Sequence, residues 1–150
     1  MSDAAAIRPM RAEDAATVAR LSGQLGYPAM EDEIRERFGR LADDPDSVVL
    51  VACGGDGGVR GWLHMAAPRD LVSPRYAEVR ALIVDEPSRG RGVGLRLLEA
   101  AEGWARGRGF ESIRVRSNIV RERARSFYER AGYRVTKTQH QFNKPLADRS

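Results

Sequence analysis

Residues 88–94, SRGRGVG, place three glycines and two arginines between an apolar stretch and a segment with helical periodicity. Because glycine has no Cβ atom, several backbone N–H groups can converge on one ligand where a strand passes into a helix. The amino end of a helix carries a partial positive charge, and Arg89 and Arg91 add full charges. The segment therefore predicts a binding site for an anion such as a phosphate or a pyrophosphate.

Two common glycine-rich phosphate motifs do not fit these residues. A dinucleotide-binding fingerprint that begins with Gly90 and Gly92 needs a third glycine at position 95, where the chain has Leu95. A P-loop needs lysine followed by serine or threonine, and no lysine lies near this segment. What remains is the pattern R-x-x-G-x-G, formed by Arg89, Gly92 and Gly94.

The spacing of apolar residues alternates between helical and strand-like along the chain. Val18, Leu21 and Leu25 recur at helical spacing, in a segment with a poor N-cap, whereas SVVLVAC and VRGWLHMA are typical of strands joined by the turn GGDGG. We expect helices over 12–25, 31–42, 92–106 and 121–131, and strands over 6–8, 47–53, 59–66, 76–84, 113–117, 133–138 and 139–144. This order predicts an α+β fold: about four helices flank a mostly antiparallel sheet of about six to seven strands, with one strand-helix-strand unit inside it.

Length and composition predict one domain over residues 1–150. No apolar run approaches the roughly 18 residues of a membrane span, and the N-terminus does not resemble a secretory signal, so we expect a cytoplasmic protein without membrane contact. The net charge of +4 favours an anionic partner without selecting one. Cys53 is the only cysteine and fits a buried free thiol, and with two histidines in the chain a metal site has little support.

A second pattern lies nearer the C-terminus than the glycine segment. It is SNIVRERARSFYERAGYRV, in which Asn118 precedes A-x-x-F-Y-x-x-x-G-Y. Together with R-x-x-G-x-G after LIVDEPS, this segment resembles the signatures of the GNAT superfamily of N-acetyltransferases. The order of the expected elements also matches that family nearly end to end. The resemblance implies a GNAT-like fold and acetyl-coenzyme A as co-substrate.

The resemblance also implies where the coenzyme lies. In that family the strand before the glycine segment and the strand at 113–117 splay apart, with the coenzyme between them. Asn118 is a candidate either for holding the pantetheine arm or for capping the next helix, and Arg125 is a candidate for the coenzyme's 3′-phosphate. The implied contacts of the pantetheine are with the backbone of Leu82, Ile83 and Val84, and those of the pyrophosphate are with Arg89, Gly90, Arg91, Gly92, Val93 and Gly94.

The implied reaction is direct transfer of acetyl from the thioester to a primary amine, with no covalent acyl-enzyme. An alkyl ammonium ion has a pKa of about 10.4, so a base must take its proton at neutral pH. Glu78, eleven residues before Arg89, matches the family's glutamate base; the alternative is a solvent-facing glutamate, or one that only binds the ammonium. Tyr128 matches a tyrosine beside the coenzyme's sulfur that protonates the leaving thiolate, with a core-packing tyrosine as the alternative.

The acceptor is less constrained than the coenzyme. Tyr27 and His64 are candidates for contact with it, together with Glu78, although His64 also fits a hydrogen-bonded packing residue. The C-terminal pattern looks like the branch of the family that acts on small-molecule amines. A protein acetyltransferase acting on lysine or an N-terminal amine is the alternative.

The charge of a small-molecule acceptor is open as well. An anionic acceptor would want spare arginines, and Arg69, Arg75 and Arg80 are candidates. A polycationic aminoglycoside would want carboxylates, for which the candidates are Glu31, Asp32 and Glu33. The arginines favour an anionic acceptor and the carboxylates favour a cationic one, so the sequence selects neither class of acceptor.

Functions from other classes are a non-catalytic acyl-coenzyme A-binding module and a nucleic-acid-binding module. Residues 106–134 contain nine arginines against three glutamates, with aromatic residues between them. The aromatic residues follow the core-facing helical period, which disfavours nucleic acid as the partner. Homodimers are common in the GNAT family, and nothing in the sequence decides whether this chain forms one.

Overall fold

The computed structural model describes residues 6–24, 26, 28–116 and 122–147. The chain divides into two compact units, Met1–Arg116 and Ser117–Ser150, and the fold of each is described by itself. Within the described ranges, no helix is both long and apolar enough to span a lipid bilayer.

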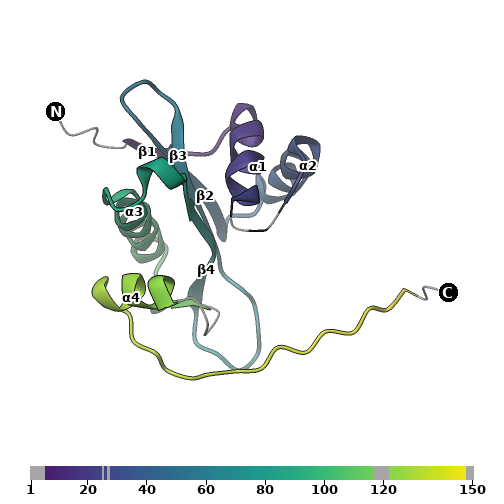
Figure 1. Cartoon of the computed structure of the whole chain (residues 1–150). Helices are drawn as coiled ribbons and strands as arrows, with labels where there is room; N and C mark the ends of the chain where they lie inside the picture. Colours follow the sequence, from purple (N-terminus) through teal and green to yellow (C-terminus); the bar gives the residue numbers. More distant parts are fainter. Residues whose placement is uncertain (1–5, 25, 27, 117–121, 148–150) are drawn as a thin grey trace. The chain divides into compact units, whose positions relative to one another are not determined.

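In the first unit, the described residues form five strands in one sheet with helices on both faces (Figure 1). The strands follow the order β1-β2-β3-β4-β5; every neighbouring pair is antiparallel except β4 and β5, which are parallel. The elements are β1 (Ala6–Pro9), the 3-10 helix η1 (Ala12–Asp14), α1 (Ala15–Gly23), α2 (Glu31–Leu41), β2 (Ser47–Cys53), β3 (Val59–Ala66), β4 (Tyr76–Val84), the 3-10 helix η2 (Glu86–Ser88), α3 (Val93–Gly107) and β5 (Ser112–Val115).

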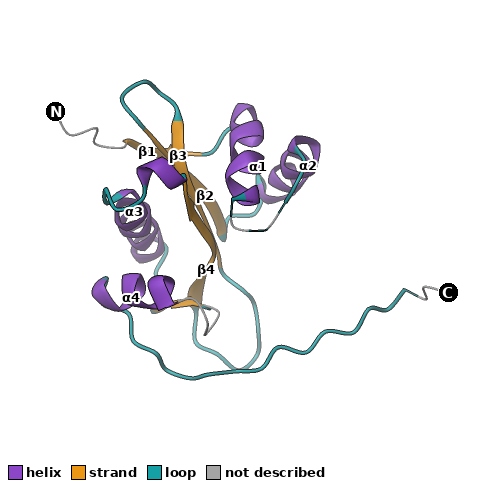
Figure 2. Ribbon diagram, in the orientation of Figure 1, coloured by secondary structure: helices purple, strands orange, loops and turns teal. Residues whose placement is uncertain are grey.

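Helix α3 connects the parallel strands β4 and β5 (Figure 2). A parallel pair requires such a crossover, because a tight turn can only reverse the chain. The predicted strand-helix-strand unit inside a largely antiparallel sheet is therefore confirmed. Its position matters for function, because the segment SRGRGVG lies between β4 and α3.

Helix α3 lies directly against β3 because a glycine leaves room for it. A Cβ atom on Gly61 would lie 3.3 Å from side-chain atoms of both Val93 and Leu97, and 2.9 Å from the carbonyl oxygen of Ile83. The first turns of α3 occupy the space that a side chain on Gly61 would need. This contact fixes the amino end of α3 against the sheet, close to the end of β4.

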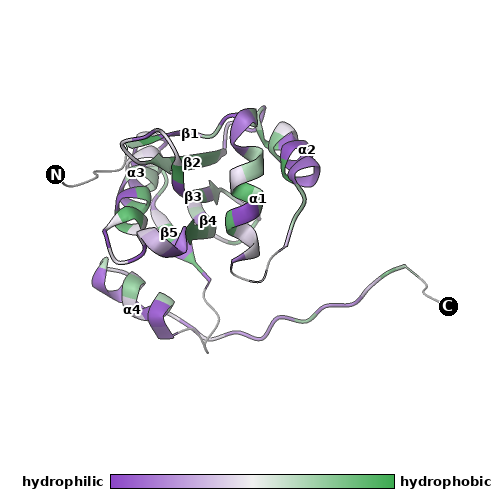
Figure 3. Cartoon of the chain, turned by 45° about the horizontal axis from the view of Figure 1, so that its top comes forward, coloured by the Kyte–Doolittle hydropathy of each residue, from purple (hydrophilic) through white to green (hydrophobic). Residues whose placement is uncertain are grey.

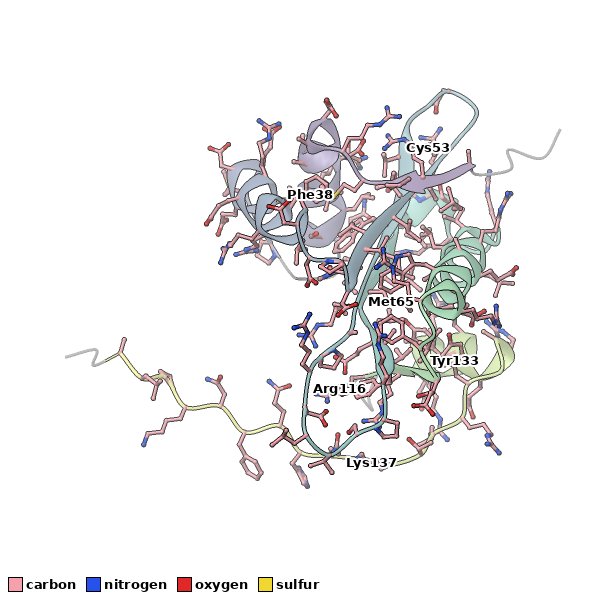
Figure 4. The ribbon with its side chains drawn as sticks, turned by 180° about the vertical axis from the view of Figure 1, so that it is seen from behind. Phe38, Cys53, Met65, Arg116, Tyr133 and Lys137 are labelled. Carbon is pink, nitrogen blue, oxygen red and sulfur yellow. The ribbon has the colours of Figure 1, made fainter. Side chains whose placement is uncertain are left out.

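Helices α1 and α2 cover the opposite face of the sheet (Figure 1). Trp62 follows Gly61 along β3, so its side chain points to this face. Figure 4 shows Phe38 on the α1–α2 side of the sheet and Met65 on the side of α3. Trp62 packs with Ile34 and Phe38 against a buried cluster that contains Met10, Ala15, Val18, Leu21, Val51, Cys53, Val59 and Ile83.

Helix α2 is amphipathic, and its outer surface is strongly polar (Figure 3). Its apolar residues Ile34 and Phe38 are only partly buried. On the polar surface, three glutamates each pair with an arginine one turn further along the helix. These ion pairs are Glu31–Arg35 at 3.2 Å, Glu33–Arg37 at 3.4 Å and Glu36–Arg40 at 3.2 Å.

The first predicted helix begins differently from the expectation. The span 12–25 contains η1 and then α1, and Leu25 lies outside the described residues. The start is well held, because the carboxylate of Asp14 accepts a hydrogen bond from the backbone N–H of Arg11 at 2.8 Å and pairs with Arg8 at 2.8 Å. The Arg8 guanidinium holds the pKa of Asp14 below its usual value. Neither N-cap residue, Arg11 for η1 and Asp14 for α1, makes a side-chain capping hydrogen bond, in agreement with the prediction of a poor N-cap.

The two predicted C-terminal strands, 133–138 and 139–144, are wrong. Residues 122–147 of the second unit contain helix α4 (Glu122–Arg130) followed by chain without regular structure. The two segments carry few apolar residues, and Val135 and Phe142 are exposed. A two-stranded hairpin with so little to bury is marginal by itself. The other predicted helices and strands are confirmed to within three residues at each end, and the described sheet has five strands rather than six or seven.

Candidate active site

The turn between β4 and α3 has a backbone that only glycine adopts without strain. Gly90 and Gly92 have φ angles of +79° and +82°, in the left-handed region. The space around both glycines is open, since a Cβ atom on either would meet nothing within 4 Å. Glycine is therefore required at these positions by backbone conformation, and the open space beside it is available to a ligand.

The first turn of α3 presents backbone donors to this open space. Gly92 caps the helix, and its carbonyl oxygen accepts the first helical hydrogen bond, from the N–H of Arg96 at 3.0 Å. An α-helix leaves the N–H groups of its first residues without an intrahelical partner, and here these follow Gly92 directly. Arg89 and Arg91 are exposed beside them. Positive helix charge, free donors and two guanidinium groups together suit a diphosphate.

Strand β4 is longer than its parallel partner, which leaves one edge open. The pairing with β5 covers Tyr76 to Val79, and no strand lies beside the rest of β4 on that edge within the described residues. The backbone N–H of Asp85 donates to β3, so alternation directs the backbone groups of Leu82 and Val84 to the open edge. An extended ligand can add to this edge as a further strand.

Two of the predicted coenzyme contacts differ from the others on this edge. Ile83 points its backbone toward β3 and contributes a buried side chain to the core. Arg89 donates from Nε to the carbonyl oxygen of Val84 at 3.0 Å, which links the glycine turn to the end of β4. The open edge and the glycine turn are thus joined by a direct hydrogen bond.

A bulge interrupts the pairing of β4 with β3. Val79 lies opposite Met65 and Ala81 lies opposite His64, which leaves Arg80 as the extra residue. Bulges re-aim side chains and increase the local twist. The side chain of Arg80 turns toward the carboxylate two residues before it.

That carboxylate belongs to Glu78, which is buried at 3% exposure where β5 ends and the edge of β4 opens. It pairs with Arg80 at 2.5 Å and with the Nε of Arg116 at 3.5 Å. A buried carboxylate is costly unless it is paired, and the two guanidinium groups supply that compensation. The structure thus places a buried carboxylate next to the open edge.

His64 lies on the same face of the sheet as Glu78. Its Nε2 atom is 3.0 Å from the hydroxyl of Ser47. Burial, and then the positive charge of Arg80, lower the pKa of His64 below its usual value, so the imidazole is neutral at neutral pH. Two other candidates, Tyr27 and Asn118, lie outside the described residues.

The second unit contains the remaining candidates, Tyr128 and Arg125. The ring of Tyr128 makes edge-to-face contacts with Phe127 and Tyr133, at centroid distances of 5.1 Å and 5.9 Å. Burial raises the pKa of the Tyr128 phenol to about 12, so the phenol is protonated at neutral pH. Arg125 pairs with Glu129 at 3.2 Å along α4.

Sequence reasoning missed one polar connection. Gln24, at the end of α1, donates to the carboxylate of Asp85 at 2.8 Å and accepts from the backbone N–H of Glu86 at 3.0 Å. Arg20 approaches the same carboxylate at 3.8 Å. These contacts tie α1 to the end of β4. A buried aspartate directly after an apolar strand was a signal for such a contact, but nothing in the sequence identifies Gln24 as its partner.

Comparison with protein-family models matches residues 15–133 to the Acetyltransferase (GNAT) family. This match covers more than half of the chain. The chain belongs to the GNAT acetyltransferase family. The identification made from R-x-x-G-x-G and the C-terminal pattern is confirmed, and the protein is an N-acetyltransferase that uses acetyl-coenzyme A as co-substrate.

Three known proteins illustrate the relationship. The chain is 39% identical over 127 residues to an aminoalkylphosphonate N-acetyltransferase of Salmonella typhimurium. The aligned region covers 84% of this chain and 78% of that protein. It is 28% identical over 151 residues to an aminoglycoside N(6′)-acetyltransferase type 1 of Stenotrophomonas maltophilia, with 97% of each chain covered. The structure of AAC(6′)-Iy, in complex with the bisubstrate analogue CoA-S-monomethyl-acetylneamine, shares the fold with a TM-score of 0.84 at 18% identity, covering 95% of this chain and 99% of that one.

Substitution of Gly92 tests the glycine turn of this acetyltransferase. We expect Gly92→Ala to weaken acetyl-coenzyme A binding by roughly 5- to 30-fold, because a left-handed backbone costs a residue with a Cβ atom about 1–2 kcal/mol. Isothermal titration calorimetry measures the change. Gly103→Ala is the matched control: Gly103 lies in α3 with open space around it and has no positive φ. Equal affinity of Gly92→Ala and wild type would refute the role of the turn.

Proposed function

We propose that this acetyltransferase transfers the acetyl group directly to a primary amine of a small molecule, with no covalent acyl-enzyme. The observation that carries the proposal is the position of a buried, ion-paired Glu78 at the point where the edge of β4 opens. The names of the relatives from Salmonella typhimurium and Stenotrophomonas maltophilia, both small-molecule N-acetyltransferases, support it.

In this proposal the coenzyme extends along the open edge of β4. Its pantetheine arm bonds to the backbone of Leu82 and Val84, as an added strand would. Its pyrophosphate binds the amides of the turn and the first turn of α3, with Arg89 and Arg91 supplying charge. Holding thioester and amine together in this groove supplies much of the rate enhancement, since attack within one complex replaces a collision in solution.

Glu78 is the proposed proton acceptor. At neutral pH, the free form of an alkyl amine lies roughly 4–5 kcal/mol above its ammonium form. A carboxylate held at the groove can bind the ammonium ion and take its proton, directly or through a water molecule, as the amine attacks. The burial of Glu78 argues against a merely solvent-facing role.

Tyr128 is the proposed proton donor to the coenzyme thiolate as it leaves. Burial raises the pKa of its phenol to about 12, so the phenol is protonated throughout the physiological pH range. The family match runs from residue 15 to residue 133 and so includes Glu78 and Tyr128. That continuity supports our proposal that both compact units belong to one acetyltransferase domain.

Replacement of Glu78 by glutamine tests the proton acceptor. We expect Glu78→Gln to lower kcat by about 10²- to 10⁴-fold at pH 7, because general base catalysis is lost. The difference in kcat between the variant and the wild type should become smaller toward pH 10, because a growing share of the amine is already deprotonated there. Free-thiol release with a panel of primary amines measures both profiles. Glu99→Gln on the exposed side of α3 is the control, and a Glu78→Gln pH profile that overlays the wild-type profile would contradict the proposal.

A second substitution tests the hydroxyl of Tyr128 while keeping its aromatic ring. We expect Tyr128→Phe to lower turnover by about 10- to 1,000-fold with little change in acetyl-coenzyme A affinity, because the hydroxyl acts on the leaving thiolate and the ring is kept. Tyr133→Phe removes a hydroxyl from the same ring cluster and serves as the comparison. Steady-state turnover together with calorimetric affinity decides the matter, and wild-type turnover in Tyr128→Phe would remove this residue from the mechanism.

A further inference from the structure

We propose that the acceptor of this acetyltransferase is a short amine that also carries an oxyanion, and that Arg80 and Arg116 bind this oxyanion. The inference rests on the proposed function, because it takes Glu78 as the site of the reacting amine. The acceptor class that follows is a small zwitterion, such as an aminoalkylphosphonate or an amino acid.

The two arginines combine a buried anchor with an exposed outer side. Each contacts the carboxylate of Glu78, whose side chain is only 4% exposed. The side chains of Arg80 and Arg116 are 52% and 69% exposed. A guanidinium has five N–H donors, so one bond to Glu78 leaves most donors available to a ligand. Planar guanidinium groups of this kind bind carboxylates and phosphonates in a bidentate manner.

The charge around Glu78 favours an anion. Arg114 lies opposite Glu78 in the parallel pair and stacks over the ring of Tyr76 at 3.8 Å, on the same face of the sheet. Arg80 and Arg116 thus share one carboxylate, which leaves an excess of one positive charge in this group. A purely cationic amine would meet repulsion here, whereas an acceptor with its own anion would neutralise the excess.

Other charged residues near this end of the sheet are already paired. Arg69 and Arg75 both contact Asp46, at 3.4 Å and 3.2 Å, beside a hollow of about 370 Å³. Like Arg80 and Arg116, they share one carboxylate, so the two pairs differ in which carboxylate they contact and not in charge compensation. Of the three arginines that the sequence offered for an anionic acceptor, Arg80 is the one that contacts the proposed proton acceptor.

Two of the three candidate carboxylates of α2 for a polycation are already paired within the helix. Glu31 and Glu33 form ion pairs with Arg35 and Arg37 on the same helix, and Glu33 also accepts a hydrogen bond from the backbone N–H of Met30 at 2.9 Å. Their negative charge is compensated by groups of the same helix or its amino end. The charge distribution therefore favours the zwitterionic acceptor over an aminoglycoside.

The contact distances limit the length of the acceptor. Arg80 lies 2.5 Å from Glu78, and hydrogen bonds from the amine to Glu78 and from the oxyanion to Arg80 add about 2.8 Å each. The amine nitrogen and the oxyanion oxygen are therefore within about 8 Å of each other. An amine and an acid group separated by one to three carbons fit this span.

Binding of the oxyanion would also prepare Glu78 for its proposed role. The acceptor's oxyanion binds the remaining donors of the two guanidinium groups, whose bonds to the carboxylate stay in place. The ammonium ion is thereby held beside Glu78, which receives its proton. The acceptor thus completes the arrangement of charges in which it reacts.

Matched acceptors test the inference on the full chain with saturating acetyl-coenzyme A. We expect kcat/KM for β-alanine to exceed that for its neutral amide by about 10- to 100-fold, the value of a charge-assisted hydrogen bond or two. The same preference should hold for 2-aminoethylphosphonate over propylamine, and neamine should be a poor acceptor. Comparison of β-alanine with 2-aminoethylphosphonate distinguishes a carboxylate from a phosphonate as the preferred oxyanion.

Arginine variants assign the preference to residues. Arg80→Ala should raise KM for the preferred anionic amine by about 10-fold or more, and by clearly more than it raises KM for propylamine. Arg80→Lys should recover part of the lost affinity for the anionic amine. Arg116→Ala should raise KM for the same amine. Arg69→Ala is the control, since it removes the same charge from a residue that is 83% exposed and paired with Asp46. Thermal unfolding verifies that each variant is folded.

Three outcomes would overturn the inference. The first is that kcat/KM is equal for β-alanine and its amide and that 2-aminoethylphosphonate is not preferred over propylamine. The second is a preference for neamine, and the third is an increase in KM for Arg80→Ala no larger than that for Arg69→Ala. If propylamine is acetylated as well as the anionic amines, only the acceptor class is wrong. If acetyl-coenzyme A binds but no amine of the panel is acetylated, the proposed function fails with it.

Discussion

Strand β4 loses its parallel partner after Val79, and the site depends on this unequal length. Backbone groups at a sheet edge must be paired by another strand, by water or by a ligand. Because β5 is short, the backbone of Leu82 and the N–H of Val84 are available just before the chain enters the glycine turn, while the Val84 carbonyl bonds to Arg89. Close packing of α3 over Gly61 holds the amino end of that helix near the same place. One strand edge and one helix end thus offer two groups of backbone donors and acceptors, separated along the chain by η2.

The chemistry proposed for the acetyltransferase lies where this edge opens. The bulge at Arg80 turns a guanidinium toward Glu78, and Arg116 approaches the carboxylate from the end of β5. The same charges that stabilise a buried carboxylate also create a positive surface around it. Catalysis and acceptor selection are therefore linked through Glu78, because an acceptor bound by the arginines has its ammonium ion held beside the carboxylate.

The sequence predicted the parts of this structure that depend on local preferences. Strand β4 has the expected bounds, 76–84, and the glycine turn has the left-handed residues that SRGRGVG indicated. The arginine partners of Glu78 were not predictable, because they depend on a bulge and on the register of a parallel pair. The contact between Gln24 and Asp85 joins residues sixty-one positions apart. The two strands expected near the C-terminus failed because alternation alone does not supply a surface to pack against.

The central claim is that the open edge of β4 and the first turn of α3 bind the coenzyme through their backbone. Amide hydrogen exchange of the full chain with and without acetyl-coenzyme A tests it most directly. We predict that the coenzyme slows exchange at Leu82, at Val84 and at the amides that follow Gly92, while the amide of Ile83, directed to β3, changes least. Slowed exchange confined to other segments, with these amides unaffected at saturating coenzyme, would contradict the account.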